Sequence, residues 1–375
     1  MKMTHSMVAL AVSVSVVCLN ASQAIANSST ISTSESILVR ADGSYPTKPL
    51  AKDNIVLKVL QTTVDELTDF PTIQSGLEHN LSHMEEIARK ACSTGKKPDF
   101  LLYHEFPLTG YGEGSRSEKE KYTVKIPGPE TERLGKIAKE CDTYIIFGSY
   151  ATDDDWPGHI LSLNAVIDRD GKLAKTFWKS RNIKRIYPDR EIMTTTIEAV
   201  RDKYRAMYGP EEEFPVLQTE YGNIAVSTVQ MDPFVFAAFA MRGTEIMVRT
   251  ATLFWEDDVT ALARINNFYS TMTNIAFPTT PEYRAGESII VDPNGKILAK
   301  DPSVDQDGII EAEIPIAKFR KGRRIPSYAL DIVKPVFEQY VQEFPLNHLD
   351  IPRENLPDTG AEMKVLMESV SRYDR

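Results

Sequence analysis

The chain has 375 residues, of which 42% are hydrophobic and 26% are charged, and its formal net charge at pH 7 is −10. This is the balance of a globular protein with enough apolar material for a core. An acidic chain without basic blocks argues against nucleic acid and anionic membranes as partners.

The N-terminus has the pattern of a secretory signal peptide. An apolar run at 7–18 is followed by a small-residue site that ends at Ala26, which predicts cleavage there. The run is shorter than the roughly 20 apolar residues that a membrane-spanning helix needs. We therefore expect a protein exported to the periplasm or secreted, with a signal peptide at 1–26 and a loose leader at 27–52.

The next part of the chain alternates predicted strands and helices. Apolar runs predict strands at 55–61, 99–104 and 144–150, and apolar residues at helical spacing predict helices at 77–92 and 130–141. A strand–helix–strand order is typical of crossover units in a largely parallel sheet.

The second half of the chain continues this pattern and adds two hairpins. The remaining predicted elements are the hairpins 161–167/173–178 and 288–291/297–299, the strands 224–229, 245–250 and 309–314, and the helices 233–242, 257–268 and 330–343. One α/β domain at 53–319, followed by a charged C-terminal extension at 320–375, is the simplest interpretation.

Chemically useful side chains stand directly after predicted strands. Glu105 and Lys179 each follow a strand, and a sharp turn at 227–232 joins a strand to a helix. Reactive groups gather at such strand ends in α/β sheets. A carboxylate beside an ammonium can act as general base and oxyanion partner in acyl transfer. From spacing alone, however, a plain surface ion pair is the more frequent explanation.

Longer stretches change this balance because they resemble the nitrilase superfamily, the carbon–nitrogen hydrolases, and most of all the aliphatic amidases and formamidases. They include NLSHMEEIARKACSTGKKPDFLLYHEFPLTGYG, LNAVIDRDGKLAKTFWKS and AGESIIVDPNGKILAK, and they reach to about residue 314. The resemblance implies a four-layer-type αββα sandwich and a Glu–Lys–Cys triad that uses no cofactor. Glu105 and Lys179 fall on the glutamate and the lysine of that triad.

The cysteine of the triad has no counterpart in this chain. Counted forward from Gly222 its place falls at Val229, and counted back from Gly243 it falls at Ser227, so the turn is two residues shorter than the family pattern. His104 also stands where the resemblance predicts proline. We take Ser227 as the candidate nucleophile; the candidate binding residues are Tyr111, Gln230, Asp232 and Thr250.

Two functions are the main candidates at this point, and a reaction other than hydrolysis in the same pocket is a third. The first is hydrolysis of the C–N bond of a small amide-like substrate, with Glu105 as base, Lys179 as oxyanion partner and either Ser227 or an activated water as nucleophile. The second is a non-catalytic binding or assembly protein that retains the fold and the pocket. The segment His104-Glu105 is a poor metal motif because position 108 is leucine, so we expect no metal.

The cysteines and one helix bear on assembly. Cys92 and Cys141 end predicted helices at similar distances before the next strands, which predicts a disulfide or a close thiol pair at the opposite end of the sheet from the site.

The helix 233–242 has almost no polar face, so it should be covered on more than one side. With the resemblance, this predicts a homodimer or a larger homo-oligomer.

Overall fold

The computed structural model describes residues 38–112, 114–182, 194–229, 231–277, 285–323, 328–343 and 356–370. The predicted signal peptide and the candidate residue Gln230 lie outside the described residues. The fold below is that of the unit 37–375. Within the described part, no helix combines the length and the apolar character needed to cross a membrane. The predicted boundaries after residues 26, 52 and 319 stay predictions.

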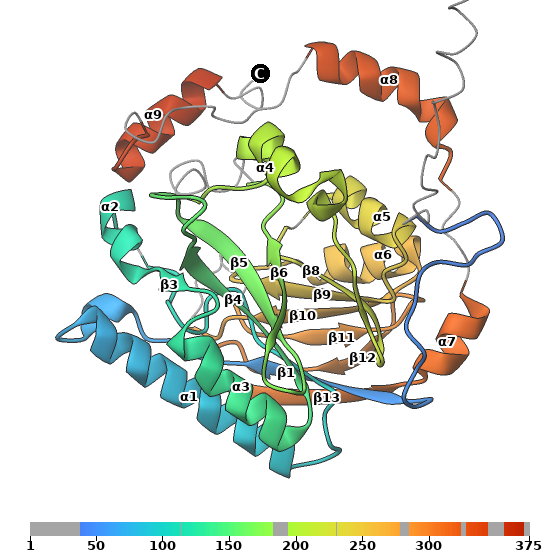
Figure 1. Ribbon diagram of the computed structural model, residues 1–375, viewed down its shortest axis with the longest axis horizontal. Coiled ribbons are helices and arrows are strands. Elements are labelled where there is room, and N and C mark those ends of the chain that lie inside the picture. The colour runs from blue at the N-terminus through green and yellow to red at the C-terminus, as the bar shows by residue number, and fades with distance from the viewer. Residues whose placement is uncertain are drawn as a thin grey trace, which may run out of the picture. The chain divides into compact units, whose positions relative to one another are not determined.

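The described strands form two sheets (Figure 1). The first sheet has the order β13-β1-β2-β4-β5-β6, with β3 beside β4, and the second has the order β12-β11-β10-β9-β8-β7. The strands are β1 (Ile55–Gln61), β2 (Phe100–Leu102), β3 (Val124–Lys125), β4 (Tyr144–Thr152), β5 (Leu161–Ile167), β6 (Leu173–Trp178), β7 (Leu217–Thr219), β8 (Gly222–Ser227), β9 (Ile246–Ala251), β10 (Tyr269–Asn274), β11 (Ile289–Val291), β12 (Ile297–Lys300) and β13 (Gly308–Ile314).

Two of the described helices begin at residues whose side chains cap them. Thr72 caps the first helix with a capping box. Asp232 caps the fifth, whose first residue is Pro233. The described helices are α1 (Ile73–Ser93), α2 (Arg116–Lys119), α3 (Pro129–Cys141), α4 (Arg201–Tyr208), α5 (Pro233–Met241), α6 (Glu256–Asn266), α7 (Ile316–Gly322), α8 (Leu330–Glu343) and α9 (Gly360–Val370).

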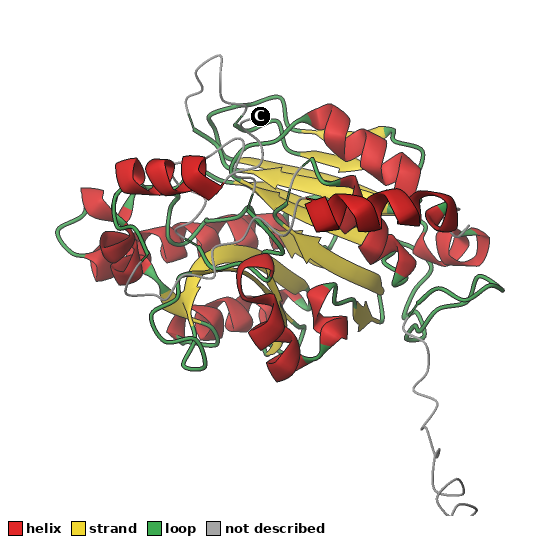
Figure 2. Ribbon diagram, turned by 90° about the horizontal axis from the view of Figure 1, so that it is seen from above, coloured by secondary structure: helices red, strands yellow, loops and turns green. Residues whose placement is uncertain are grey.

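The two sheets pack face to face, and helices cover their outer faces (Figures 1 and 2). The core between the sheets combines apolar side chains of both, such as Leu57 and Val59 from the first and Val226 and Val248 from the second. A second core joins α1 and α3 to the outer face of the first sheet. This arrangement confirms the predicted αββα sandwich.

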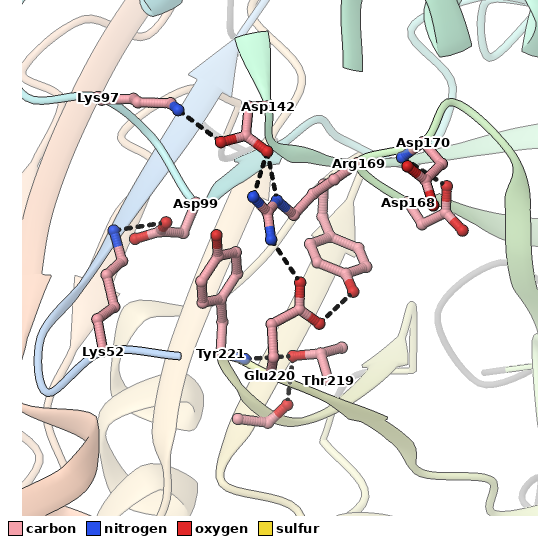
Figure 3. Close-up of polar contacts among 12 residues, drawn as sticks. Lys52, Lys97, Asp99, Asp142, Asp168, Arg169, Asp170, Thr219, Glu220 and Tyr221 are labelled. Atoms are coloured by element: carbon pink, nitrogen blue, oxygen red, sulfur yellow. Dashed lines mark hydrogen bonds and ion pairs between the residues drawn. The ribbon is translucent and has the colours of Figure 1, made fainter. Parts of the chain in front are cut away.

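Polar and charged side chains connect the two sheets at the end where α3 leads into β4 (Figure 3). Arg169, in the turn between β5 and β6, donates to Glu220 at 2.9 Å and also pairs with Asp142. Tyr144 donates to the same glutamate at 2.8 Å, and Lys97 lies 2.7 Å from Asp142. Because Glu220 belongs to the second sheet's β7–β8 turn, this network spans both sheets. We call these five residues the Arg169 cluster.

A covalent link lies beside this cluster. Cys92 and Cys141 form a disulfide, and their Cα atoms are 5.9 Å apart. Cys141 directly precedes Asp142, so the bridge ends one residue from the Arg169 cluster. The predicted pairing of the two cysteines is confirmed.

The structure contains short elements that the sequence did not predict, namely β3, β7, α2 and α7, and it differs from the expectations in three larger features. The strand predicted over 224–229 ends at Ser227, because the chain turns there. The strand β10 was not predicted, because its sequence YSTMTN is polar although all of it is buried. The helix α9 was not predicted within the charged extension, yet its Met363 is fully buried.

Candidate active site

Glu105 and Lys179 meet inside the protein. Glu105 lies just beyond β2 and is only 6% exposed. One carboxylate oxygen, Oε1, is 3.7 Å from the Lys179 ammonium. The other, Oε2, accepts a hydrogen bond of 2.9 Å from the Thr252 hydroxyl. The structure therefore joins the two residues that the sequence paired and adds a hydroxyl that the sequence analysis missed.

The backbone around Lys179 fixes where its side chain starts. Its N–H donates to the Ser162 carbonyl of β5 at 3.1 Å, and its carbonyl accepts from the Ile197 N–H at 3.1 Å. The Lys179 side chain is 12% exposed. A carboxylate and an ammonium so placed can supply a base and an oxyanion partner at one point.

His104, directly before Glu105, is a neutral structural residue. Its Nδ1 accepts the Phe106 N–H at 3.3 Å, so Nε2 carries the proton and donates to the Thr62 hydroxyl at 2.9 Å. Complete burial lowers the pKa of His104 to about 3. At neutral pH this side chain is therefore uncharged, and its hydrogen bonds hold it in place.

The parallel register of β8 and β9 places the Ser227 side chain on the helix-facing side of the second sheet. Ser227 pairs with Arg249. The Arg249 guanidinium lies over the Phe236 ring of α5 at 4.4 Å, so it faces the helices. The next residue, Thr250, points the other way and donates to Asn164 of the first sheet at 2.8 Å. Because side chains alternate along a strand, Ser227 points away from the space between the sheets.

The contacts of the Ser227 hydroxyl agree with this placement. Its oxygen accepts the Val229 N–H at 3.2 Å. Among the described contacts, no hydrogen bond connects it to Glu105 or Lys179. The next hydroxyl, that of Thr228, is buried and has no hydrogen-bond partner within the described part of the chain.

Two charged residues hold the turn after β8; we call Arg249 and Asp258 the turn clamp. Arg249, 1% exposed, donates from Nη2 to the Val229 carbonyl at 3.3 Å and to Asp258 at 2.6 Å. Asp258 also accepts the Met231 N–H at 3.3 Å. Met231 has a left-handed backbone with φ of 49°. The clamp therefore fixes both sides of the shortened turn.

The remaining candidate residues each have partners of their own. Asp232 caps α5 and pairs with Arg181. The Thr250 hydroxyl donates to the Asn164 side chain between the two sheets. The Tyr111 ring lies near Phe106. No described side chain contact joins these candidates to Glu105, and no described group of three or more His, Cys, Asp or Glu is placed to hold a metal ion.

An αββα sandwich with a buried Glu–Lys pair at its strand ends has the architecture of the nitrilase superfamily. The chain belongs to the carbon–nitrogen hydrolase family, whose model matches residues 70–324. It is 29% identical over 209 residues to the omega-amidase NIT2 of Xenopus tropicalis, covering 52% of this chain and 70% of that protein. The human omega-amidase NIT2 is 26% identical over 234 residues, covering 57% of this chain and 80% of that protein.

Solved structures show the same fold. Nit3 of Saccharomyces cerevisiae, a member of the nitrilase superfamily, superposes with a TM-score of 0.59 at 18% identity, covering 75% of this chain and 98% of that one. A mutant of the amidase from Nesterenkonia AN1 superposes with a TM-score of 0.51 at 17% identity, covering 78% of this chain and 99% of that one. In another structure of that amidase, the acetamide moiety of fluoroacetamide is covalently added at the active-site cysteine.

Proposed function

We propose that this protein hydrolyses the C–N bond of a small amide-like substrate without a cysteine nucleophile. The observation that carries the proposal is the buried contact of 3.7 Å between Glu105 and Lys179. Membership of the carbon–nitrogen hydrolase family and the amidase relatives give this pair a chemical context. The hydrogen bond from Thr252 fixes the second oxygen of the carboxylate.

In the proposed reaction Glu105 activates a water molecule. The carboxylate takes a proton from the water, whose oxygen attacks the amide carbon while the Lys179 ammonium stabilises the negative charge that develops on the carbonyl oxygen. When the tetrahedral intermediate collapses, the C–N bond breaks and Glu105 returns the proton to the departing nitrogen. The products are a carboxylic acid and ammonia or an amine.

Water is favoured over Ser227 as nucleophile because of the geometry. The strand register turns the Ser227 side chain toward the helices. Ser227 remains the alternative nucleophile, and Thr228, the next residue, is a second buried hydroxyl to test.

A non-catalytic binding protein is the second candidate. The segment between Gly222 and Phe234 contains no cysteine, and this supports a protein that retains the fold without the reaction. Export to the periplasm or beyond is part of the proposal under either function. The apolar run at 7–18 supports it, and so does the disulfide, since such bridges persist in oxidising compartments. Assembly into a homo-oligomer also remains a proposal.

The proposal is tested by ammonia release from small aliphatic amides. We expect Glu105→Gln and Lys179→Met to lower kcat/KM by roughly 100-fold or more, while Ser227→Ala and Thr228→Val change it only a few-fold. Glu132→Gln, on the exposed side of α3, is the matched carboxylate control.

The outcomes separate the candidates. A loss in Ser227→Ala as large as that in Glu105→Gln would identify Ser227 as the nucleophile. Absence of ammonia release by the unmodified protein, with a folded chain by circular dichroism, would favour the binding function.

A further inference from the structure

A hollow of about 600 Å³ opens beside the edge strand β6, under α4. Its walls include the rings of Trp178, Tyr204 and Tyr208. The volume falls within the usual range of small-molecule sites. Consecutive residues of β6, from Leu173 to Thr176, line the hollow, so it lies along the edge of the first sheet, and neither Glu105 nor Lys179 is part of its lining.

The aromatic walls are fixed by their own packing. The centroids of the Trp178 and Tyr204 rings are 5.1 Å apart, and those of Tyr204 and Tyr208 are 4.9 Å apart. Trp156 is fully buried, and the centroid of its ring lies 5.2 Å from that of Trp178. Its indole N–H donates to the Tyr208 hydroxyl at 2.9 Å. A ligand would therefore meet preformed aromatic surfaces, which lowers the entropy cost of binding.

The charged groups of the lining leave an excess of negative charge. The ammonium of Lys175 contacts both carboxylate oxygens of Glu212, at 3.0 and 2.7 Å, so these two charges offset each other. Asp153 is the other carboxylate of the lining, and one of its oxygens accepts the Asp155 N–H at 2.8 Å. Burial, and then the negative charges of Asp153 and Asp155, raise the pKa of Tyr208.

The same aromatic cluster already holds a cation of the chain itself. The ammonium of Lys203 lies 3.9 Å from the centroid of the Trp156 ring. Aromatic faces attract ammonium ions through their quadrupole, and tryptophan does so most strongly. An aromatic wall with an adjacent carboxylate is the chemistry that recognises organic ammonium groups.

We propose that the hollow between β6 and α4 binds a small organic ammonium ion. The ion would contact the exposed ring surfaces of Trp178 and Tyr208, and its charge would be offset by Asp153. This inference rests on the hollow alone and does not depend on the proposed hydrolysis.

The test is a titration of the purified full chain with choline, followed by tryptophan fluorescence at constant ionic strength. Trp156 and Trp178 are two of the three tryptophans of the chain, so binding changes the emission directly. We expect a saturable change with choline and none with 3,3-dimethylbutan-1-ol, which has the same shape without the charge. Saturation-transfer difference NMR of choline gives a second readout that does not depend on the tryptophans.

Variants make the test specific. Asp153→Asn should weaken choline binding by roughly tenfold, as expected for the loss of a charge-assisted contact, and Trp178→Leu should weaken it in the NMR experiment. Asp170→Asn, in the exposed turn between β5 and β6, is the matched control and should leave the affinity unchanged. Equal binding of the neutral alcohol, an unchanged affinity in folded Asp153→Asn, or a response to choline that does not saturate would each overturn the proposal.

Discussion

The turn clamp provides the most direct test of how the shortened turn is held. Asp258→Asn keeps the shape of the side chain but removes the charge that faces the Arg249 guanidinium at 2.6 Å. Arg249 is 1% exposed, so its charge would remain buried without a counter-ion. Removing one partner of a buried ion pair typically costs about 3–5 kcal/mol. Because the Asp258 side chain is 15% exposed and water reaches it, we expect a loss near 3 kcal/mol.

The opposite change should be milder. Arg249→Met removes the buried charge together with the contact to the Val229 carbonyl, and it leaves Asp258 partly hydrated. We expect a loss of about 1–3 kcal/mol, the range for an unsatisfied buried polar group. The double variant should be more stable than the sum of the single losses predicts, since each change removes the same interaction.

The assay is chemical denaturation, with the free energy of unfolding compared across the cycle. Asp257→Asn, on the exposed side of α6, is the matched control and should change stability by less than about 0.5 kcal/mol. The reasoning fails if Asp258→Asn costs less than about 1 kcal/mol, or if the losses in the double variant simply add.

Three further predictions concern pH, the disulfide and the missing cysteine. The pKa of His104 in the folded protein is about 3, so between pH ~6.5 and 3 only the unfolded chain binds a proton at this residue, and the free energy of unfolding should fall by about 1.4 kcal/mol per pH unit as the pH is lowered. His104→Gln should lack this contribution when the denaturation midpoint is measured from pH 7 to 4. Equal dependence of the midpoint on pH in the variant and the unmodified protein would contradict it. Replacing both Cys92 and Cys141 by serine should lower the free energy of unfolding by about 2–4 kcal/mol, as measured by chemical denaturation against the unmodified chain under oxidising conditions. If the unmodified protein were as stable with its disulfide reduced as with it oxidised, the prediction would be wrong. Ser227→Cys should not raise ammonia release from amides, since its side chain faces α5, whereas a gain in Val229→Cys would identify that position as the nucleophile's place; a gain in Ser227→Cys would show the register argument to be mistaken.

The sequence predicted the part of the site that strand ends and the family resemblance mark together. Glu105 and Lys179 each follow a strand, and the resemblance to the nitrilase superfamily is what paired them; their contact is confirmed in the structure. Thr252 and the turn clamp could not be predicted, because their contacts depend on the register between β8 and β9 and on the packing of α6. Thr252 could have been noted as a polar residue just past β9.

The same distinction applies to the fold. Strands and helices with regular apolar spacing were predicted close to their observed bounds. The strand β10 lacks that spacing because hydroxyl groups replace apolar ones. Two of these hydroxyls bond to the backbone: Ser270 donates to the Met247 carbonyl and Thr273 to the Leu102 carbonyl. Periodicity cannot reveal a strand whose burial relies on such bonds.

The disulfide and the Arg169 cluster occupy one end of the first sheet, and Glu105 occupies the other end of β2. Contacts that resist unfolding are thus separated from the groups proposed to react. Substitutions of side chains at the reacting end leave the disulfide and the Arg169 cluster intact, so part of their cost in stability is carried by contacts that they do not touch. A chain built in this way can exchange one chemistry for another while its scaffold stays the same.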